Sequence, residues 1–270
     1  MLSLFKYIKN ILSPVPALHV ALDIGNKRHK TIVLLHGIAA TSKTWDLLIN
    51  ELGTDKYRII ALDLLGFGQS PKPSGYKYDA NDHIASVHKT LKKLKIRQPF
   101  IIVGHSMGAI ISSHYYTKYP AEIKEMFLLS PPIYLSDDDS QTIITRKRTD
   151  LYLDAYKFIS EKKDFTITNS QLIRKLLLVK DGIDVNQNNW EGFRLSLMNT
   201  IVKQETYNEI WNAKIPVYIF YGSLDEFLIQ ESINKLAILK KVKITKLDGV
   251  DHVIGKRFAI EVARMIINSK

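Results

Sequence analysis

The sequence predicts an α/β fold, in which a mostly parallel central sheet is covered by helices on both faces and carries a helical cap insertion. Two observations predict this fold class. Short runs of β-branched and aliphatic residues alternate with helical segments, a pattern typical of parallel strands that are buried on both faces. The alternation stops for about 80 residues after residue 133 and then resumes, which indicates an insertion between two parts of one sheet.

An amphipathic pattern covers residues 1–12. At helical spacing, Ser3, Lys6, Lys9 and Asn10 fall on one side and apolar residues occupy the rest. We expect a helix that docks on the body of the protein or, as the alternative, makes peripheral contact with a membrane. The segment lacks the uninterrupted apolar core and the cleavage site of a signal peptide, and the chain has no apolar run of about 18 residues. The sequence therefore predicts a cytoplasmic protein.

The first half of the predicted sheet lies between residues 30 and 133. Residues 17–29 carry no clear pattern, and Lys30–Leu35 is the first predicted strand. Residues 42–52 are predicted to be helical, because Ser42 is a suitable N-cap and Gly53 a suitable C-terminal stop. The strands and helices predicted next are the strands Tyr57–Leu62, Phe100–Val103 and Glu125–Leu129 and the helices Asp79–Leu94 and Met107–Tyr119.

Residues 134–213 are predicted to form a helical cap, since this stretch has helical patterns but no strong strand. Residues 1–133 and 214–270 are predicted to form the core. The helices expected in the cap are Leu151–Ile159, Gln171–Val179 and Trp190–Val202. The elements expected after it are strand Ile215–Tyr221, helix Glu231–Leu239, strand Val242–Leu247 and helix Phe258–Ile267.

Composition restricts the classes of function. The chain of 270 residues has no cysteine, which excludes disulfides, thiolate catalysis and cysteine-ligated zinc; neither a metal nor a cofactor is predicted. Its formal net charge is +11, but the basic residues are scattered and no nucleic-acid-reading motif accompanies them. We therefore expect no nucleic-acid partner and interpret the lysines mainly as solvated helix surface. The oligomeric state is not predicted.

The most informative motif is Gly-His-Ser-Met-Gly at residues 104–108. It follows an apolar strand and precedes a helix, so Ser106 is expected on a sharp strand–turn–helix connection. Gly104 and Gly108 leave room for neighbouring backbone. At the start of a helix, free N–H groups and the helix dipole favour developing negative charge near Ser106. A Gly-x-Ser-x-Gly pentad is weak by itself, and its context gives it weight.

With its surroundings, this motif resembles the α/β-hydrolase superfamily, and in particular its capped, esterase-like members. The resemblance covers about residues 30–133 and 214–270. It is carried by His36-Gly37, the loop Asp63…Gly66-Phe67-Gly68…Ser70, the pentad at 104–108, Asp225 and His252. One departure is Asp251, where relatives commonly carry glycine before the histidine.

The resemblance implies a catalytic triad of Ser106 as nucleophile, His252 as base and Asp225 as the acid that orients the base. A serine hydroxyl needs a base to take its proton, and the imidazole needs an acid to hold its tautomer. The three residues are in the chain order that this fold uses, and each follows a predicted strand. Glu226 remains an alternative to Asp225.

The oxyanion hole is expected to use the backbone N–H groups of Met107 and Ile38, with Ala39 as an alternative to Ile38. Serine at position 106 disfavours dehalogenase and epoxide-hydrolase chemistry, since relatives with those activities use a carboxylate nucleophile on this turn. The expected reaction is therefore hydrolysis of a small-molecule carboxylic ester or thioester through an acyl-enzyme, with a small to medium acyl group. The candidate substrate contacts are Phe67, Trp190, Phe193, Tyr221 and Phe227.

Two other functions remain open at this point. A hydrolase-fold protein can bind a small molecule with little turnover, although such proteins often lack a triad residue. A membrane-surface lipase would be recruited through residues 1–12 and the positive charge.

Overall fold

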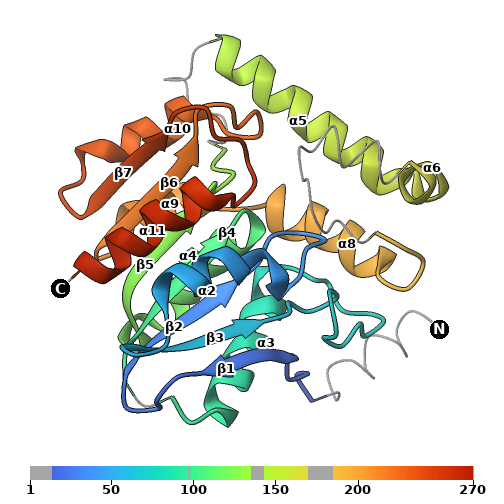
Figure 1. The fold of residues 1–270 in the computed structure, drawn as a ribbon. Coiled ribbons are helices and arrows are strands. Elements are labelled where there is room, and N and C mark those ends of the chain that lie inside the picture. Colours follow the sequence, from blue (N-terminus) through green and yellow to red (C-terminus); the bar gives the residue numbers. More distant parts are fainter. Residues whose placement is uncertain (1–13, 97, 135–142, 170–184, 270) are drawn as a thin grey trace.

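A computed structural model describes residues 14–96, 98–134, 143–169 and 185–269 (Figure 1). Two predicted elements, the amphipathic segment 1–12 and the helix at 171–179, lie outside the described residues.

A seven-stranded sheet forms the centre of the molecule, in the order β1-β3-β2-β4-β5-β6-β7. All neighbouring strands are parallel except β1, which runs antiparallel to β3 at the edge. Every residue of β3 and β4 is buried, as expected of strands covered on both faces. The strands are β1 (Val20–Ile24), β2 (Lys30–Leu35), β3 (Tyr57–Leu62), β4 (Phe100–His105), β5 (Ile123–Leu129), β6 (Val217–Gly222) and β7 (Val242–Leu247).

Helices cover the two faces of this sheet unequally (Figure 1). On one face, α2 (Asp46–Leu52) and α11 (Lys256–Asn268) pack against each other and bury Trp45, Leu48 and Phe258 on the strands. The other face is larger, and its core joins the sheet to the helices of the second half of the chain. The helices on that face are α3 (Ala80–Lys93), α4 (Met107–Lys118), α9 (Thr206–Asn212) and α10 (Gln230–Lys235). Short 3-10 turns occur at Ser42–Trp45, Pro120–Glu122 and Leu236–Ile238.

Between β5 and β6, the elements that the structure describes are all helical. In Figure 1, α5 (Ile143–Glu161) and α6 (Lys163–Thr168) lie on the outer side, with α8 (Trp190–Ser196) between them and the sheet. A π-helical turn at Leu197–Ile201 continues α8. Helix α9 then packs on α4, which brings the chain back to the sheet.

The structure confirms the predicted fold class and adds elements that the pattern did not indicate. Strand β1 lies within the stretch interpreted as unpatterned, although Val20, Leu22 and Ile24 alternate with more exposed residues. Arg58 fixes this edge strand through two hydrogen bonds of 2.8 Å to Asp23. Helix α9 was also not predicted. Helix α5 is longer than the predicted Leu151–Ile159 segment.

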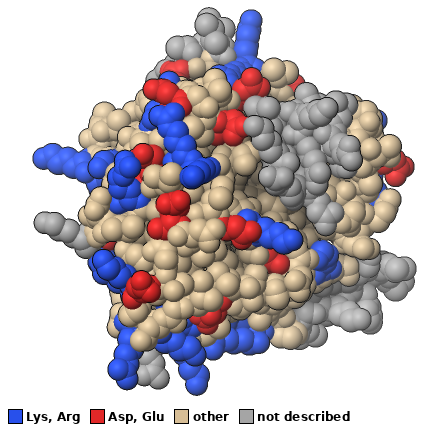
Figure 2. All heavy atoms as spheres, in the orientation of Figure 1, with Lys and Arg blue, Asp and Glu red and all other residues tan. Residues whose placement is uncertain are grey.

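The charged groups on the face seen in Figure 2 are mixed in sign. Lys and Arg side chains lie scattered among Asp, Glu and neutral residues. In the part of the chain that the structure describes, no helix is long and apolar enough to span a bilayer.

The connection from β4 to α4 is tightly packed against neighbouring backbone. A Cβ added to Gly104 would lie 2.2 Å from the carbonyl oxygen of Gly108, and one added to Gly108 would lie 2.0 Å from that of Leu35. Both obstacles are backbone atoms, which cannot move aside as a flexible side chain could. The start of α4 therefore packs directly on the end of β2.

We expect Gly108→Ala to lower the free energy of unfolding by about 1–3 kcal/mol or more, because the added methyl overlaps the β2 backbone. Urea denaturation measures the loss. Gly255→Ala is the matched control: nothing lies within 4 Å of its added Cβ, and the N-cap position costs at most about 1 kcal/mol. Equal losses in the two variants would contradict the packing described here.

Candidate active site

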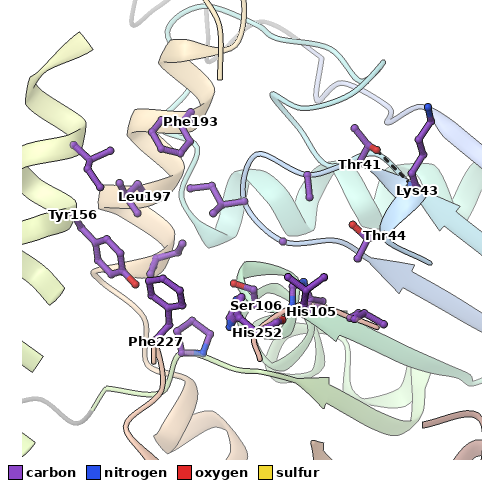
Figure 3. Close-up of a pocket in the computed structure, with 18 of the residues that line it drawn as sticks. Thr41, Lys43, Thr44, His105, Ser106, Tyr156, Phe193, Leu197, Phe227 and His252 are labelled. Atoms are coloured by element: carbon purple, nitrogen blue, oxygen red, sulfur yellow. Dashed lines mark hydrogen bonds between the residues drawn. The ribbon is translucent and has the colours of Figure 1, made fainter. Parts of the chain in front are cut away.

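A cavity of about 550 Å³ opens where the parallel strands end. Residues that follow β2, β4, β5, β6 and β7 all contribute to its lining, as expected at the carboxyl edge of an open parallel sheet. Its lining includes Ile38 and, labelled in Figure 3, His105, Ser106, Phe193, Phe227 and His252.

Ser106 lies on the turn between β4 and α4 with a positive φ of 53°. This conformation is costly for a residue with a side chain, and the packing of both flanking glycines enforces it. The turn places the Ser106 hydroxyl on the floor of the cavity at the start of α4 (Figure 3). The sequence expectation of a strand–turn–helix connection at this residue matches the geometry.

His252 and Asp225 form a buried pair beside Ser106. Nδ1 of His252 lies 2.8 Å from Oδ2 of Asp225, and both side chains are at least nine-tenths buried. Since the ionised carboxylate can only accept, Nδ1–H is the donor, and Nε2 is left as the ring nitrogen that can take a proton. In Figure 3, the His252 ring lies next to Ser106.

Asp225 is held in its ionised form. Burial by itself would raise the pKa of this carboxyl, but the charge and the hydrogen bond of His252 oppose it, as does the Phe227 N–H at 3.1 Å. The net effect places the pKa of Asp225 below its ordinary value. A charged acid beside the imidazole stabilises the imidazolium that forms when His252 takes a proton.

His105 makes a buried contact to the His252 loop that the sequence did not indicate. Its Nε2–H donates to the backbone carbonyl oxygen of His252 at 2.8 Å. Burial lowers the pKa of His105 to about 3, so the ring is neutral at ordinary pH. His105 therefore ties the end of β4, directly before Ser106, to the loop that carries His252. Only the position of His105 inside the pentad could have suggested this.

His36 orders the loop after β2. The Leu64 N–H donates to its Nε2 at 2.8 Å, so the proton of the neutral ring lies on Nδ1, which donates to the Gly37 carbonyl at 2.7 Å. Burial lowers the pKa of His36 to about 4. These two bonds fix the backbone immediately before Ile38.

The two residues expected to supply backbone donors belong to different segments, the loop after β2 and the start of α4. Ile38 lines the cavity. Met107 is the first residue of α4, and its N–H therefore belongs to the first helical turn, where N–H groups have no acceptor within the helix.

The predicted substrate contacts divide into two groups. Phe193 and Phe227 line the cavity. Phe67, Trp190 and Tyr221 do not, because each is buried in the core instead. Phe67 packs edge-on against His36, Trp190 against Phe193, and the Tyr221 hydroxyl donates to Asn234. The sequence shows that aromatic residues follow the strands but not which way their rings point.

Helix α5 contributes Tyr156 and Ile159 to the cavity, a contribution that the sequence did not indicate. The Tyr156 and Tyr134 hydroxyls are 2.9 Å apart, and Tyr134 also donates to the Phe227 carbonyl. This chain of bonds joins α5 to the loop after β6. Within the described residues, no group of three or more His, Asp or Glu side chains is placed to hold a metal ion.

Comparison with known proteins identifies relatives of this architecture. The sequence profile of the alpha/beta hydrolase fold family matches residues 30–254. The probable lysophospholipase BODYGUARD 4 of Arabidopsis thaliana is 32% identical over 122 residues, which are 44% of this chain and 29% of that protein. Lipase 1 of Psychrobacter immobilis is 23% identical over 87% of this chain and 74% of its own length.

Solved structures of low identity share the same fold. An esterase from Exiguobacterium antarcticum superposes with a TM-score of 0.67 at 16% identity, covering 94% of this chain and 98% of the esterase. The aligned segment spans less than a third of the BODYGUARD 4 sequence.

Three buried histidines predict how stability depends on pH. Burial lowers the pKa of His83 to about 3, that of His36 to about 4 and that of His105 to about 3. Nε2 of His83 lies 3.1 Å from the Ser196 hydroxyl. The unfolded chain binds protons at these rings near pH 6.5, whereas the folded chain does not. The unfolded state therefore binds more protons, and stability should fall as pH falls from 6.5 towards 4.

Between pH 6.5 and pH 4, we expect each of these rings to lower the free energy of unfolding by about 1.4 kcal/mol for each unit by which the pH falls. His83→Gln should reduce the slope of unfolding free energy against pH by the equivalent of one proton, measured by urea denaturation at several pH values. Ser196→Ala should lower stability but keep the slope, since the titrating ring remains. An unchanged slope in His83→Gln would show that His83 is not held neutral.

Proposed function

This chain belongs to the alpha/beta hydrolase fold family, as an esterase- or lipase-like member, and we propose that it is a serine hydrolase that cleaves a carboxylic ester or thioester through an acyl-enzyme. The observation that carries the proposal is the 2.8 Å bond from His252 to Asp225 in the same cavity as Ser106. Lipase and lysophospholipase are also the names of relatives, which supports ester hydrolysis in general.

In the proposed acylation step, the Ser106 oxygen attacks the carbonyl carbon of the ester while Nε2 of His252 takes the hydroxyl proton. Asp225 keeps the imidazole in the tautomer that leaves Nε2 free, and its charge stabilises the imidazolium. When the tetrahedral intermediate collapses, the bond to the alcohol breaks, and the imidazolium gives its proton to the departing oxygen. The acyl group then remains on Ser106.

Deacylation repeats the sequence with water as the nucleophile. Nε2 of His252 takes a proton from water, the hydroxide attacks the acyl carbon, and the proton returns to the Ser106 oxygen as the acid leaves. We propose that the backbone N–H groups of Ile38 and Met107 stabilise the negative oxygen in both steps. Backbone donors place no demand on their side chains, which is compatible with isoleucine and methionine at these positions.

We propose that residues 134–213 act as the cap of this site. Tyr156 and Ile159 of α5 and Phe193 of α8 line the cavity opposite the strand ends. The His83–Ser196 bond ties α8 to the core helix α3. A wall of this kind excludes water from the acyl group, and a cavity of about 550 Å³ suits a small to medium acyl chain.

The proposal predicts that a fluorophosphonate probe labels the protein at Ser106. Ser106→Ala should abolish labelling and lower kcat for a p-nitrophenyl ester by about 10⁴-fold or more, and Asp225→Asn should lower kcat by about 10⁴-fold. Mass spectrometry of the labelled peptide and steady-state kinetics measure the two effects. Ser74→Ala, at an exposed position, is the control that should keep both the labelling and the wild-type kcat. A well-folded protein that is neither labelled nor active would support a binding function instead.

A further inference from the structure

The polar side chains of the cavity are concentrated on one short segment. Apart from His105, Ser106, His252 and Tyr156, every polar residue in the lining belongs to residues 41–46. These residues are Thr41, Lys43, Thr44 and Asp46. Figure 3 shows Thr41, Lys43 and Thr44 on one side of Ser106, and Phe193, Leu197 and Tyr156 on the other. The turn and the helices thus lie on opposite sides of Ser106, and we call these sides the polar half and the apolar half of the cavity. Other residues in the lining are apolar, namely Ile38, Ala40, Leu47, Pro132, Val253 and Ile254.

The apolar half is enclosed by helices. It consists of the side chains of Ile159, Phe193, Leu197, Ile201 and Phe227 together with the ring of Tyr156. Phe193, Leu197 and Ile201 are buried in the hydrophobic core, and the Tyr156 hydroxyl is already bonded to Tyr134. The free energy of binding an acyl chain is most favourable where the chain is completely removed from water, so this half is suited to the acyl group.

The polar half is built on a turn that the core holds in place. Trp45, a residue of this turn, has a fully buried side chain that anchors it in the core. The Ser42 N–H donates to the Asp63 carboxylate at 2.9 Å. The same carboxylate accepts from the Gln69 N–H at 2.9 Å, which fixes its orientation. These contacts hold the backbone of the segment in place, so binding a group here does not carry the ordering cost of a mobile loop.

Three polar groups on this turn are not used by the protein itself. In the part of the chain that is described, Nζ of Lys43, the hydroxyl of Thr44 and the carboxylate of Asp46 have no hydrogen-bond partner. In the view of Figure 3, Thr44 lies between Ser106 and Lys43, and the chain of Lys43 points away from Ser106. Lys43 and Asp46 are exposed, so this half of the cavity meets solvent. A group bound here can be hydrogen-bonded without being fully desolvated.

We propose that the turn at residues 41–46 binds the alcohol half of the ester, and that this alcohol is a neutral, hydroxylated one of the glycerol type. The inference rests on the proposed function and specifies its substrate class. Hydroxyl groups both donate and accept, which matches a threonine hydroxyl flanked by an ammonium and a carboxylate. The opposite charges of Lys43 and Asp46 compensate each other, which favours a neutral alcohol over one with a single net charge. Thr44 is then a specificity-determining residue.

A matched pair of octanoyl esters tests this inference. Glyceryl 1-octanoate and n-propyl octanoate share the acyl group and the three-carbon alcohol, and differ in two hydroxyls. The ratio of their kcat/KM values is measured for the wild type, Thr44→Val, Thr44→Ser and Lys43→Met. Lys240→Met, an exposed lysine away from the cavity, is the control. Comparing each ratio with the wild-type ratio cancels the different intrinsic reactivities of the two esters.

We expect Thr44→Val and Lys43→Met each to lower the glyceryl-to-propyl ratio by about 3- to 10-fold, the effect of one lost hydrogen bond. Thr44→Ser and Lys240→Met should keep the wild-type ratio. An unchanged ratio in both Thr44→Val and Lys43→Met, with Ser106-dependent hydrolysis of both esters, would overturn this inference and leave the proposed function intact. Hydrolysis that persists in Ser106→Ala, or a folded wild type that cleaves no ester, would instead overturn the proposed function.

Discussion

The turn between β4 and α4 has no space for a side chain at either of its glycines, and the rest of the site depends on that constraint. Gly108 lies against the Leu35 carbonyl, so the helix begins directly on the neighbouring strand. Ser106 can then adopt only its strained conformation, with its hydroxyl towards the cavity. The same contact brings the start of α4 close to the loop after β2. The proposed nucleophile and the proposed oxyanion donors thus belong to segments that meet at one packing interaction.

The neighbouring loops are held by neutral histidines rather than by ion pairs. His36 fixes the loop after β2, and His105 bonds the backbone of His252. Both rings are buried, and both have a lowered pKa for that reason. A neutral ring adds no positive charge beside the pair formed by His252 and Asp225. The arrangement separates the groups that hold the site from the group proposed to carry protons.

Much of this architecture can be predicted from local sequence, but side-chain direction cannot. The strands Lys30–Leu35 and Val242–Leu247 have the predicted bounds. The first is a nearly continuous apolar run that is buried, whereas the second is an edge strand with exposed residues at Lys243 and Lys246. Strand β1 was missed since an edge strand alternates over only five residues. The aromatic residues Phe67 and Phe227 both follow strands, yet one packs in the core and the other faces the cavity. That difference arises from tertiary packing, as does the bond from His105 to His252.

The central claim is that a serine, an imidazole and a carboxylate from distant parts of the chain act as one unit. Rapid quenching of the reaction with p-nitrophenyl octanoate, followed by peptide mass spectrometry, tests this most directly. We predict an octanoyl group on the peptide that contains Ser106, formed in the wild type and absent on the same timescale in His252→Ala. An octanoyl group on another residue, or one that forms on Ser106 equally fast without His252, would contradict the account.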